Sequence, residues 1–491
     1  MPEIICAERS ATGQLIEVKY PSPDQDINGI GVILAFTVGV YAAWILAVVA
    51  YVCRLVPPRL LNQCDALFVG VRPRVRHRDH VDDLDRAVLA FADQQLVACI
   101  GIPIAGLVKI SEASIFDFQT IIYLGWLSSN MFLTAVSTLH EYFHPRPWAR
   151  SFRVAGMLCT MVLICATLYP TSWYAWQAFV LWPDIACPNA ANCPALSKSA
   201  PEIWDHTKQQ VSVTSIPSRT GITYFVLVLG HVWQAAKLFR PIHYFLMRWC
   251  RKPLEWLEWW IAKQRAGGRS YRLLVGVYMI LLAVLDWTGS HVFTLSLMLF
   301  SIGYGSFHLL TPRYKTIPSC VRDKMNEWSY GQILPMLLLL GPLLGIISRL
   351  IEAQGAWSLR ASSRMLDEGS VWHHENGANT TPRTIPAMFK QLACATSDRS
   401  QRNEMQVSLH QKLYSVVQFR MILGLLMLYA LLMAVSFFVW TYVGYVVAPW
   451  PYATWTKEWL LSPIAATGGA GAIIFLVVAL ALCFVGSGVI K

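Results

Sequence analysis

The sequence predicts an all-α membrane protein: a polytopic bundle of about ten transmembrane helices, with the N-terminus outside the cytoplasm. Hydrophobic residues make up 55% of the 491 residues and charged residues only 14%, whereas an ordinary soluble domain carries roughly 25% charge. Mean hydropathy is +0.43. Several apolar runs exceed the roughly 18 residues that mark a membrane span. This composition excludes a disordered chain, a coiled coil and a small disulfide scaffold.

Positive charge predicts the orientation of the chain. The net charge is +11, and Lys and Arg gather in two polar stretches, residues 54–92 and 237–271. Cytoplasmic loops of membrane proteins collect such residues, which also meet anionic lipid there. Both stretches are therefore predicted to be cytoplasmic, and the polar segment 1–28 is predicted to lie outside. No nucleic-acid partner is expected, because no binding motif accompanies the charge.

The membrane bundle is predicted to cover residues 29–349 and to open with five spans. A further outer loop, 171–219, separates the fourth span from the fifth. The predicted spans lie at about 29–53, 94–111, 119–140, 152–170 and 220–236.

Residues 272–310 allow two interpretations, because they are too long for a single span of about 20 residues. A polar break, Asp286 to His291, contains Gly289, which permits a turn. We favour two short spans joined by a tight outer hairpin, which gives ten spans. The alternative is one span preceded by a buried or interfacial helix, which gives nine spans and moves everything after residue 310 to the other side.

The C-terminal part is predicted to contain one more bundle span, 331–349, then a long polar loop, 350–415, and a two-span segment, 416–491. The last two spans are expected at 418–447 and 464–488. Apolar runs of sufficient length support these three spans, and none occurs within 350–415.

An amphipathic helix is predicted at 253–261, inside the second basic stretch. Leu254, Leu257 and Ile261 lie at helical spacing and share one face. The helix is expected either to lie in the membrane interface, where Trp side chains are favoured, or to dock on the cytoplasmic ends of the bundle.

The string His140-Glu141-Tyr142-Phe143-His144 fits the H-E-x-x-H pattern. On a helix, the two histidines share a face and can bind zinc, with the glutamate as general base. Pro145 follows at once, however, and ends such a helix. No clear third ligand follows either. We interpret the string as a polar helix end, so no metal and no cofactor is expected, and we keep a membrane-embedded zinc hydrolase as an alternative.

Two predicted outer segments carry candidate modification sites. Cys187 and Cys193 lie in the loop 171–219, where oxidising conditions favour a disulfide between them. Asn379-Thr380-Thr381 is a glycosylation sequon. It is used only if residues 350–415 face the lumen.

Polar residues near the ends of apolar spans predict a binding cluster on the cytoplasmic side. Such residues are costly against lipid and turn into the bundle. The alternative is that each one caps its own helix. The candidates are Asp93, Gln94, Gln95, Gln332 and His308.

Four stretches carry a resemblance to a large group of uncharacterised fungal multi-pass integral membrane proteins. They touch most of the first 350 residues. They are Ala92-Asp93-Gln94-Gln95-Leu96-Val97; the run 121–129, IIYLGWLSS; Arg146-Pro147-Trp148 with Arg150 and Arg153; and the run 327–335, EWSYGQILP. The resemblance implies a filamentous fungus and a home in the plasma membrane or an endomembrane, and it transfers no catalytic role.

Three function classes follow from these features. The first, which we favour, is a binding or signalling scaffold in the membrane for a small-molecule or protein ligand that the sequence does not identify. The second is a transporter or channel for a small solute, because Pro103 and Pro335 interrupt predicted spans. The third is the zinc hydrolase using His140, Glu141 and His144. No enzymatic activity is favoured.

Overall fold

The computed structural model contains two compact units. Unit 1 comprises Met1–Val56, Arg74–Arg240 and Leu295–Leu359, and unit 2 comprises Pro57–Pro73, Pro241–Thr294 and Arg360–Lys491. The structure describes residues 3–9, 15–21, 23–52, 61–69, 78–139, 146–170, 218–265, 268–315, 319–340, 385–394 and 399–446, together with Val56, Phe143 and Ile317.

The N-terminal segment contains a β-hairpin, which adds two short strands to the predicted helical architecture. Strand β1 (Glu3–Arg9) pairs antiparallel with β2 (Leu15–Pro21), in a register that runs from Glu3↔Pro21 to Arg9↔Leu15. Both strands contain β-branched residues, which favour extended backbone. The polar composition of residues 1–28 concealed these two short strands. A one-turn helix, α1 (Gln25–Asn28), follows the hairpin.

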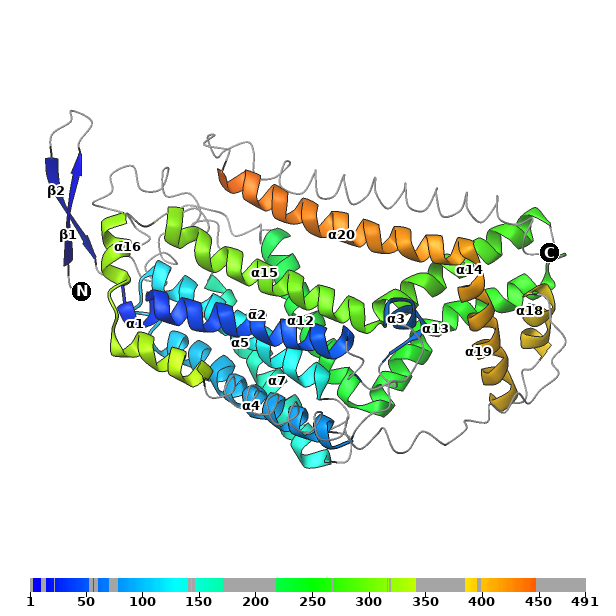
Figure 1. Cartoon of the computed structure of the whole chain (residues 1–491). Coiled ribbons are helices and arrows are strands. Elements are labelled where there is room, and N and C mark those ends of the chain that lie inside the picture. The colour runs from blue at the N-terminus through cyan, green and yellow to red at the C-terminus, as the bar shows by residue number, and fades with distance from the viewer. Residues whose placement is uncertain are drawn as a thin grey trace, which may run out of the picture. The chain divides into compact units, whose positions relative to one another are not determined.

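Unit 1 is helical beyond the hairpin, and its helices match the first five predicted spans (Figure 1). Helix α5 contacts α2, α4, α7 and α12. Helix α4 begins well inside the stretch predicted as a polar loop, 54–92. The elements are α2 (Ile30–Val52), α4 (Arg78–Val108), α5 (Ile115–Thr138), α7 (Pro147–Leu168), α12 (Ser218–Leu238), most of α15 (His291–Lys315), α16 (Ser319–Met325) and a helix Tyr330–Leu340.

Contacts within unit 1 fix the direction of α15. Its last turn lies beside the start of α2, because Arg313 donates a hydrogen bond to the carbonyl of Asn28. Its beginning lies beside the second half of α2, because the indole of Trp44 donates to the carbonyl of Leu295 at 2.9 Å. Helix α15 therefore runs antiparallel to α2.

This direction contradicts the outer hairpin predicted for residues 272–310. Two separate helices do occur there, α14 (Arg269–Thr288) and α15, with Gly289 and Ser290 between them. If α14 and α15 formed a hairpin on the side of the N-terminus, α15 would begin beside the start of α2. In the structure α15 ends there instead. The break at Gly289 was predicted from local sequence, which says nothing about the side of the bundle on which it lies.

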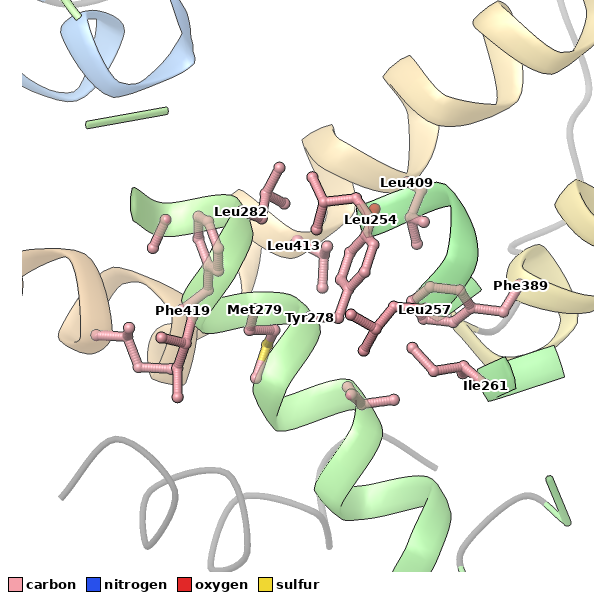
Figure 2. Close-up of a cluster of buried hydrophobic side chains, with 14 of the residues drawn as sticks. Leu254, Leu257, Ile261, Tyr278, Met279, Leu282, Phe389, Leu409, Leu413 and Phe419 are labelled. Carbon is pink, nitrogen blue, oxygen red and sulfur yellow. The ribbon is translucent and has the colours of Figure 1, made fainter. Parts of the chain in front are cut away.

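Unit 2 is built around one apolar core (Figure 2). Helix α13 (Arg240–Lys263) buries Leu254, Leu257 and Ile261 in it. The apolar stripe therefore packs against protein. The other elements of the unit are α3 (Gln63–Val69), α14, α18 (Ile385–Cys394), α19 (Arg399–Ser415) and α20 (Val417–Val446).

Helices α18 and α19 correct the prediction of an irregular loop over 350–415. Phe389 and Leu392 of α18 pack with Leu409 and Leu413 of α19, and all four are buried in the core of unit 2. Each helix has one narrow apolar face at helical spacing. Such a face is hard to detect in a polar segment that lacks a run long enough to cross a membrane.

Five helices are long and apolar enough to cross a membrane among the residues that the structure describes. Two shorter apolar helices, Ala92–Val108 and Tyr330–Leu340, fall within further predicted spans. The final predicted span, 464–488, lies outside the described residues. The five helices are Gln25–Val52, Pro147–Leu168, Arg269–Thr288, His291–Tyr314 and Val417–Val435.

Glycine allows helices of unit 1 to pack at short range. A Cβ atom at Gly305 of α15 would lie 2.6 Å from Cδ1 of Trp126, closer than real contacts permit. Trp126 cannot move freely, because its indole donates to the carbonyl of Ser301 at 2.9 Å and its side chain is only 1% exposed. Small residues at helix interfaces serve this purpose in membrane bundles.

We predict that Gly305→Ala destabilises the protein by about 1–3 kcal/mol, because the added methyl group overpacks the Trp126 site. The matched control is Gly101→Ala in α4, where an added Cβ meets nothing within 4 Å and where helix propensity favours alanine. Thermal unfolding in one detergent compares the two variants. Equal midpoints for both variants would contradict the close contact.

Candidate functional site

The residues predicted to form a cytoplasmic polar cluster are engaged with separate partners. Asp93 of α4 pairs with Arg153 of α7 at 2.5 Å. Gln94 donates from Nε2 to the carbonyl of Leu338 at 2.9 Å. The Oε1 of Gln95 accepts from Ser128 of α5 at 3.0 Å. Three consecutive side chains thus join α4 to three different helices.

Gln332 lies at the N-terminal side of the bundle instead. Its side chain is fully buried, and its Oε1 accepts from the backbone N–H of Gly31 at 3.2 Å. Its Nε2 donates to the carbonyls of Met325 at 3.3 Å and Glu327 at 2.6 Å. The amide therefore fastens the start of α2 to the start of the helix Tyr330–Leu340.

The structure does not bring Gln332 together with Asp93, Gln94 and Gln95. No hydrogen bond joins it to any of the three among the residues that the structure describes. The contact of Gln94 falls at Leu338, six residues beyond Gln332, which is about 9 Å along a helix. The prediction placed Gln332 at the opposite end of the bundle from the start of α2, whereas Gln332 bonds Gly31 there, because α15 runs opposite to the predicted direction.

His308 belongs to an aromatic cluster in the core of unit 1. Its ring stacks on Tyr123 with centroids 5.0 Å apart, and it lies 4.4 Å from the ring of Tyr304. The hydroxyl of Tyr304 shares a hydrogen bond of 2.9 Å with Thr223 of α12. His308, Tyr123 and Tyr304 are all buried, so this cluster joins α5, α12 and α15.

A buried network that the sequence did not reveal joins the N-terminal segment to three helices. Asp117 and Ser114 form a capping box at the start of α5. Asp117 also accepts a hydrogen bond from the side-chain amide of Asn28. The carbonyl of Asn28 accepts from Arg313, which also donates to Asn326. Asn326 is distant from the apolar runs, so sequence reasoning had no signal for it.

A second polar junction holds the break between α14 and α15 in unit 2. The carboxylate of Asp65, on α3, is fully buried. It accepts from the backbone N–H groups of His291 at 3.0 Å and Val292 at 3.1 Å. These are the first two residues of α15, so Asp65 satisfies donors that a helix start leaves open. Asn62 donates to the carbonyl of Asp286 at 2.6 Å.

Titratable groups around this junction are unsuited to nucleophilic chemistry. Burial, with smaller contributions from the carboxylates of Asp65 and Asp286, raises the pKa of the Cys64 thiol to about 12. The pKa of Tyr414 is also raised, mainly by burial and to a smaller extent by Asp286, whose carboxylate accepts a hydrogen bond from the Tyr414 hydroxyl at 2.7 Å. A thiolate is the reactive form of cysteine, so Cys64 is an inert, packed side chain at neutral pH.

The remaining sequence-predicted sites lie outside the described residues. These sites are His140, Glu141 and His144, the cysteine pair Cys187 and Cys193, and the sequon asparagine Asn379. Within the described part of the chain, no group of three or more His, Cys, Asp or Glu side chains is placed to hold a metal ion.

Taken together, the buried polar groups connect helices. Asp93, Gln94, Gln95, Gln332 and His308 each contact a residue on another helix, and Asp65 and Asp117 cap helix starts. A polar group removed from water is stable only when it is hydrogen-bonded. The arrangement suits a rigid framework with fixed helix positions.

Comparison with known proteins gives one distant similarity. The chain is 29% identical over 106 residues to the "Elsinochromes biosynthesis cluster protein HP3" of Elsinoe fawcettii, a match that covers 22% of this chain and 43% of that protein. The chain thus spans less than half the length of the curated relative it matches. No protein-family model matches the chain, and no solved structure does. The fungal relative agrees with the fungal origin that the sequence predicts.

We predict that Asp65→Ala lowers the free energy of unfolding by about 1–3 kcal/mol, because the N–H groups of His291 and Val292 lose a buried acceptor. Asp65→Asn keeps one acceptor oxygen and should lose less. Asp323→Ala, an exposed carboxylate on α16, is the matched control and should stay within about 0.5 kcal/mol of the wild type. If Asp65→Ala unfolds at the wild-type midpoint, the cap contributes nothing.

Proposed function

We propose that this protein is a multi-pass membrane scaffold that binds a partner through a fixed helical framework. The observation that carries the proposal is that polar side chains inside unit 1 form hydrogen bonds between helices. Ser128, Gln95, Ser129 and His231 are all buried and bonded across helices. Side chains that lined a solute path would instead be open to water.

The conformation of Pro103 also supports a scaffold over a transporter. Transporter sites use broken helices whose free ends bind ions. Helix α4 continues through Pro103 to Val108. A Cβ at Gly125 of α5 would lie 3.1 Å from Cγ of Pro103, so the proline ring packs closely against α5 at that glycine. The proline therefore acts as a packing residue of a continuous helix.

We extend the proposal to nine spans with the N-terminus outside. The first half of α12 lies beside the middle of α15, because Thr223 bonds Tyr304. The end of α12 lies near the beginning of α15, because Ala235 and Leu238 share a buried cluster with Met298. Residues 240 and 295 therefore lie at the same end of unit 1. The chain between α12 and α15 therefore crosses the membrane an even number of times. Helix α14 is then not a single additional span between them. Residues 350–415 are consequently cytoplasmic.

Cysteine accessibility tests the scaffold. We expect Ser128→Cys to resist a charged methanethiosulfonate reagent applied to native membranes, because its side chain is buried between α4 and α5. Ser111→Cys, exposed between the same helices, is the matched control and should react. Peptide mass spectrometry resolves each cysteine. Rapid labelling at position 128 would reveal a water-filled path and favour a solute transporter.

Glycosylation tests the topology. We expect Asn379 to carry no N-glycan, because nine spans place it in the cytoplasm. The control is Ala191→Thr, which creates a sequon at Asn189 in the loop 171–219, predicted to be outside for nine or ten spans. Gel mobility before and after peptide N-glycosidase F gives the answer. A glycan on Asn379 would refute the nine-span arrangement and restore the luminal placement of residues 350–415.

A further inference from the structure

Helix α13 has two chemically distinct faces. Its apolar stripe is buried in the core of unit 2, with Leu254, Leu257 and Ile261 at most 6% exposed (Figure 2). The opposite face carries large aromatic side chains in the open. Trp249 is 63% exposed and Trp256 is 61% exposed, and Trp259 and Trp260 are also exposed. In the described part of the chain, burying the stripe has therefore left a second, exposed aromatic surface.

Positive charge accompanies these tryptophans at helical spacing. Arg248, Lys252, Trp256, Trp259 and Lys263 follow one another at intervals of three or four residues, so they share one face. The Nζ of Lys252 lies 5.5 Å from the ring centroid of Trp249, and that of Lys263 lies 3.2 Å from that of Trp259. Arg248, Lys252 and Lys263 are exposed.

The acidic residues of α13 do not neutralise this face. Glu258 is buried, and its Oε1 accepts from the hydroxyl of Tyr278 at 3.1 Å. Glu255 is half-buried and lies three residues after Lys252, so a single carboxylate stands against the three exposed cations Arg248, Lys252 and Lys263. Among the described residues of α13, the exposed ionisable side chains in contact with tryptophan rings are cationic.

We propose that this tryptophan–cation face, formed by Arg248, Trp249, Lys252, Trp256, Trp259 and Lys263, binds the headgroups of anionic phospholipids. Tryptophan is favoured at the headgroup level of a bilayer, where one part of the ring is apolar and the N–H is hydrated. Lys and Arg next to it are attracted to the negative surface of the cytoplasmic leaflet. Charge complementarity thus selects anionic lipid as the partner.

The inference goes beyond the scaffold, because it concerns which lipid the protein holds. It combines the two alternatives that the sequence left open for this helix: the leucine stripe packs on protein, and the tryptophans meet the membrane. Only the choice of leaflet depends on the proposed topology. Retention of anionic lipid is independent of the solute path that the cysteine experiment tests, so the two proposals can fail separately.

The test uses the full chain, reconstituted in liposomes of phosphatidylcholine and phosphatidylserine at a 7:3 ratio and then extracted in mild detergent. Mass spectrometry measures the ratio of the two lipids that remain bound. We expect phosphatidylserine to be enriched over the bulk ratio. The triple variant Arg248→Gln, Lys252→Gln, Lys263→Gln should lower that enrichment about threefold or more, because the attraction adds up over the cations.

The matched control removes the same charge elsewhere: Lys109→Gln, Lys324→Gln and Lys390→Gln are three exposed cations outside α13. It should retain the enrichment. Extraction of the wild type at 1 M NaCl, where the Debye length shrinks to about 3 Å, should abolish the enrichment without any substitution. Equal enrichment in the α13 variant and the wild type would overturn the proposal. A change in the oligomeric state of the α13 variant with unchanged lipid enrichment would also overturn it, because the face would then be a contact between copies of the chain.

Discussion

A polar group surrounded by apolar helices needs a hydrogen-bond partner inside the protein, and this requirement organises the structure. An unpaired donor or acceptor in such surroundings costs about 1–3 kcal/mol. Gln332 meets the requirement by bonding three backbone groups. Arg313, which is only 1% exposed, bonds Asn28 and Asn326. Each solution brings segments from distant parts of the chain into fixed contact.

Helix ends show the same requirement in another form. The first N–H groups of a helix have no partner within it. At α5 a nearby serine and aspartate supply the acceptors, so the start is encoded locally. At α15 the hydroxyl of Ser290 accepts from the N–H of Phe293 at 3.0 Å, and Asp65, 226 residues away in the sequence, accepts from the N–H groups of His291 and Val292. The start of α15 is therefore held by a local cap and by a contact from α3.

These two cases explain how much the sequence could predict. Apolar length is a local property, so α5 and α7 were located to within a few residues. The direction of α15 depends on the contact of Arg313 with Asn28 and on that of Trp44 in α2 with Leu295, which no local pattern records. The proposed cluster around Gln332 failed for that reason. The buried stripe of α13 was identified correctly, but its partners, such as Phe389 and Leu413, lay in a segment interpreted as a loop.

The bond between Gly31 and Gln332 has a consequence for synthesis of the protein, because 301 residues separate its ends. A ribosome adds about 5–20 residues per second, so the first helix waits on the order of 15–60 s for this partner. During that interval the backbone N–H of Gly31 lacks its acceptor, Gln332, and the surface of Gly31 that Trp328 covers stays exposed. The membrane-insertion machinery, or a chaperone beside it, has to shelter α2 until the helix Tyr330–Leu340 arrives. The bundle is thus completed late, after the ribosome has synthesised the helix Tyr330–Leu340.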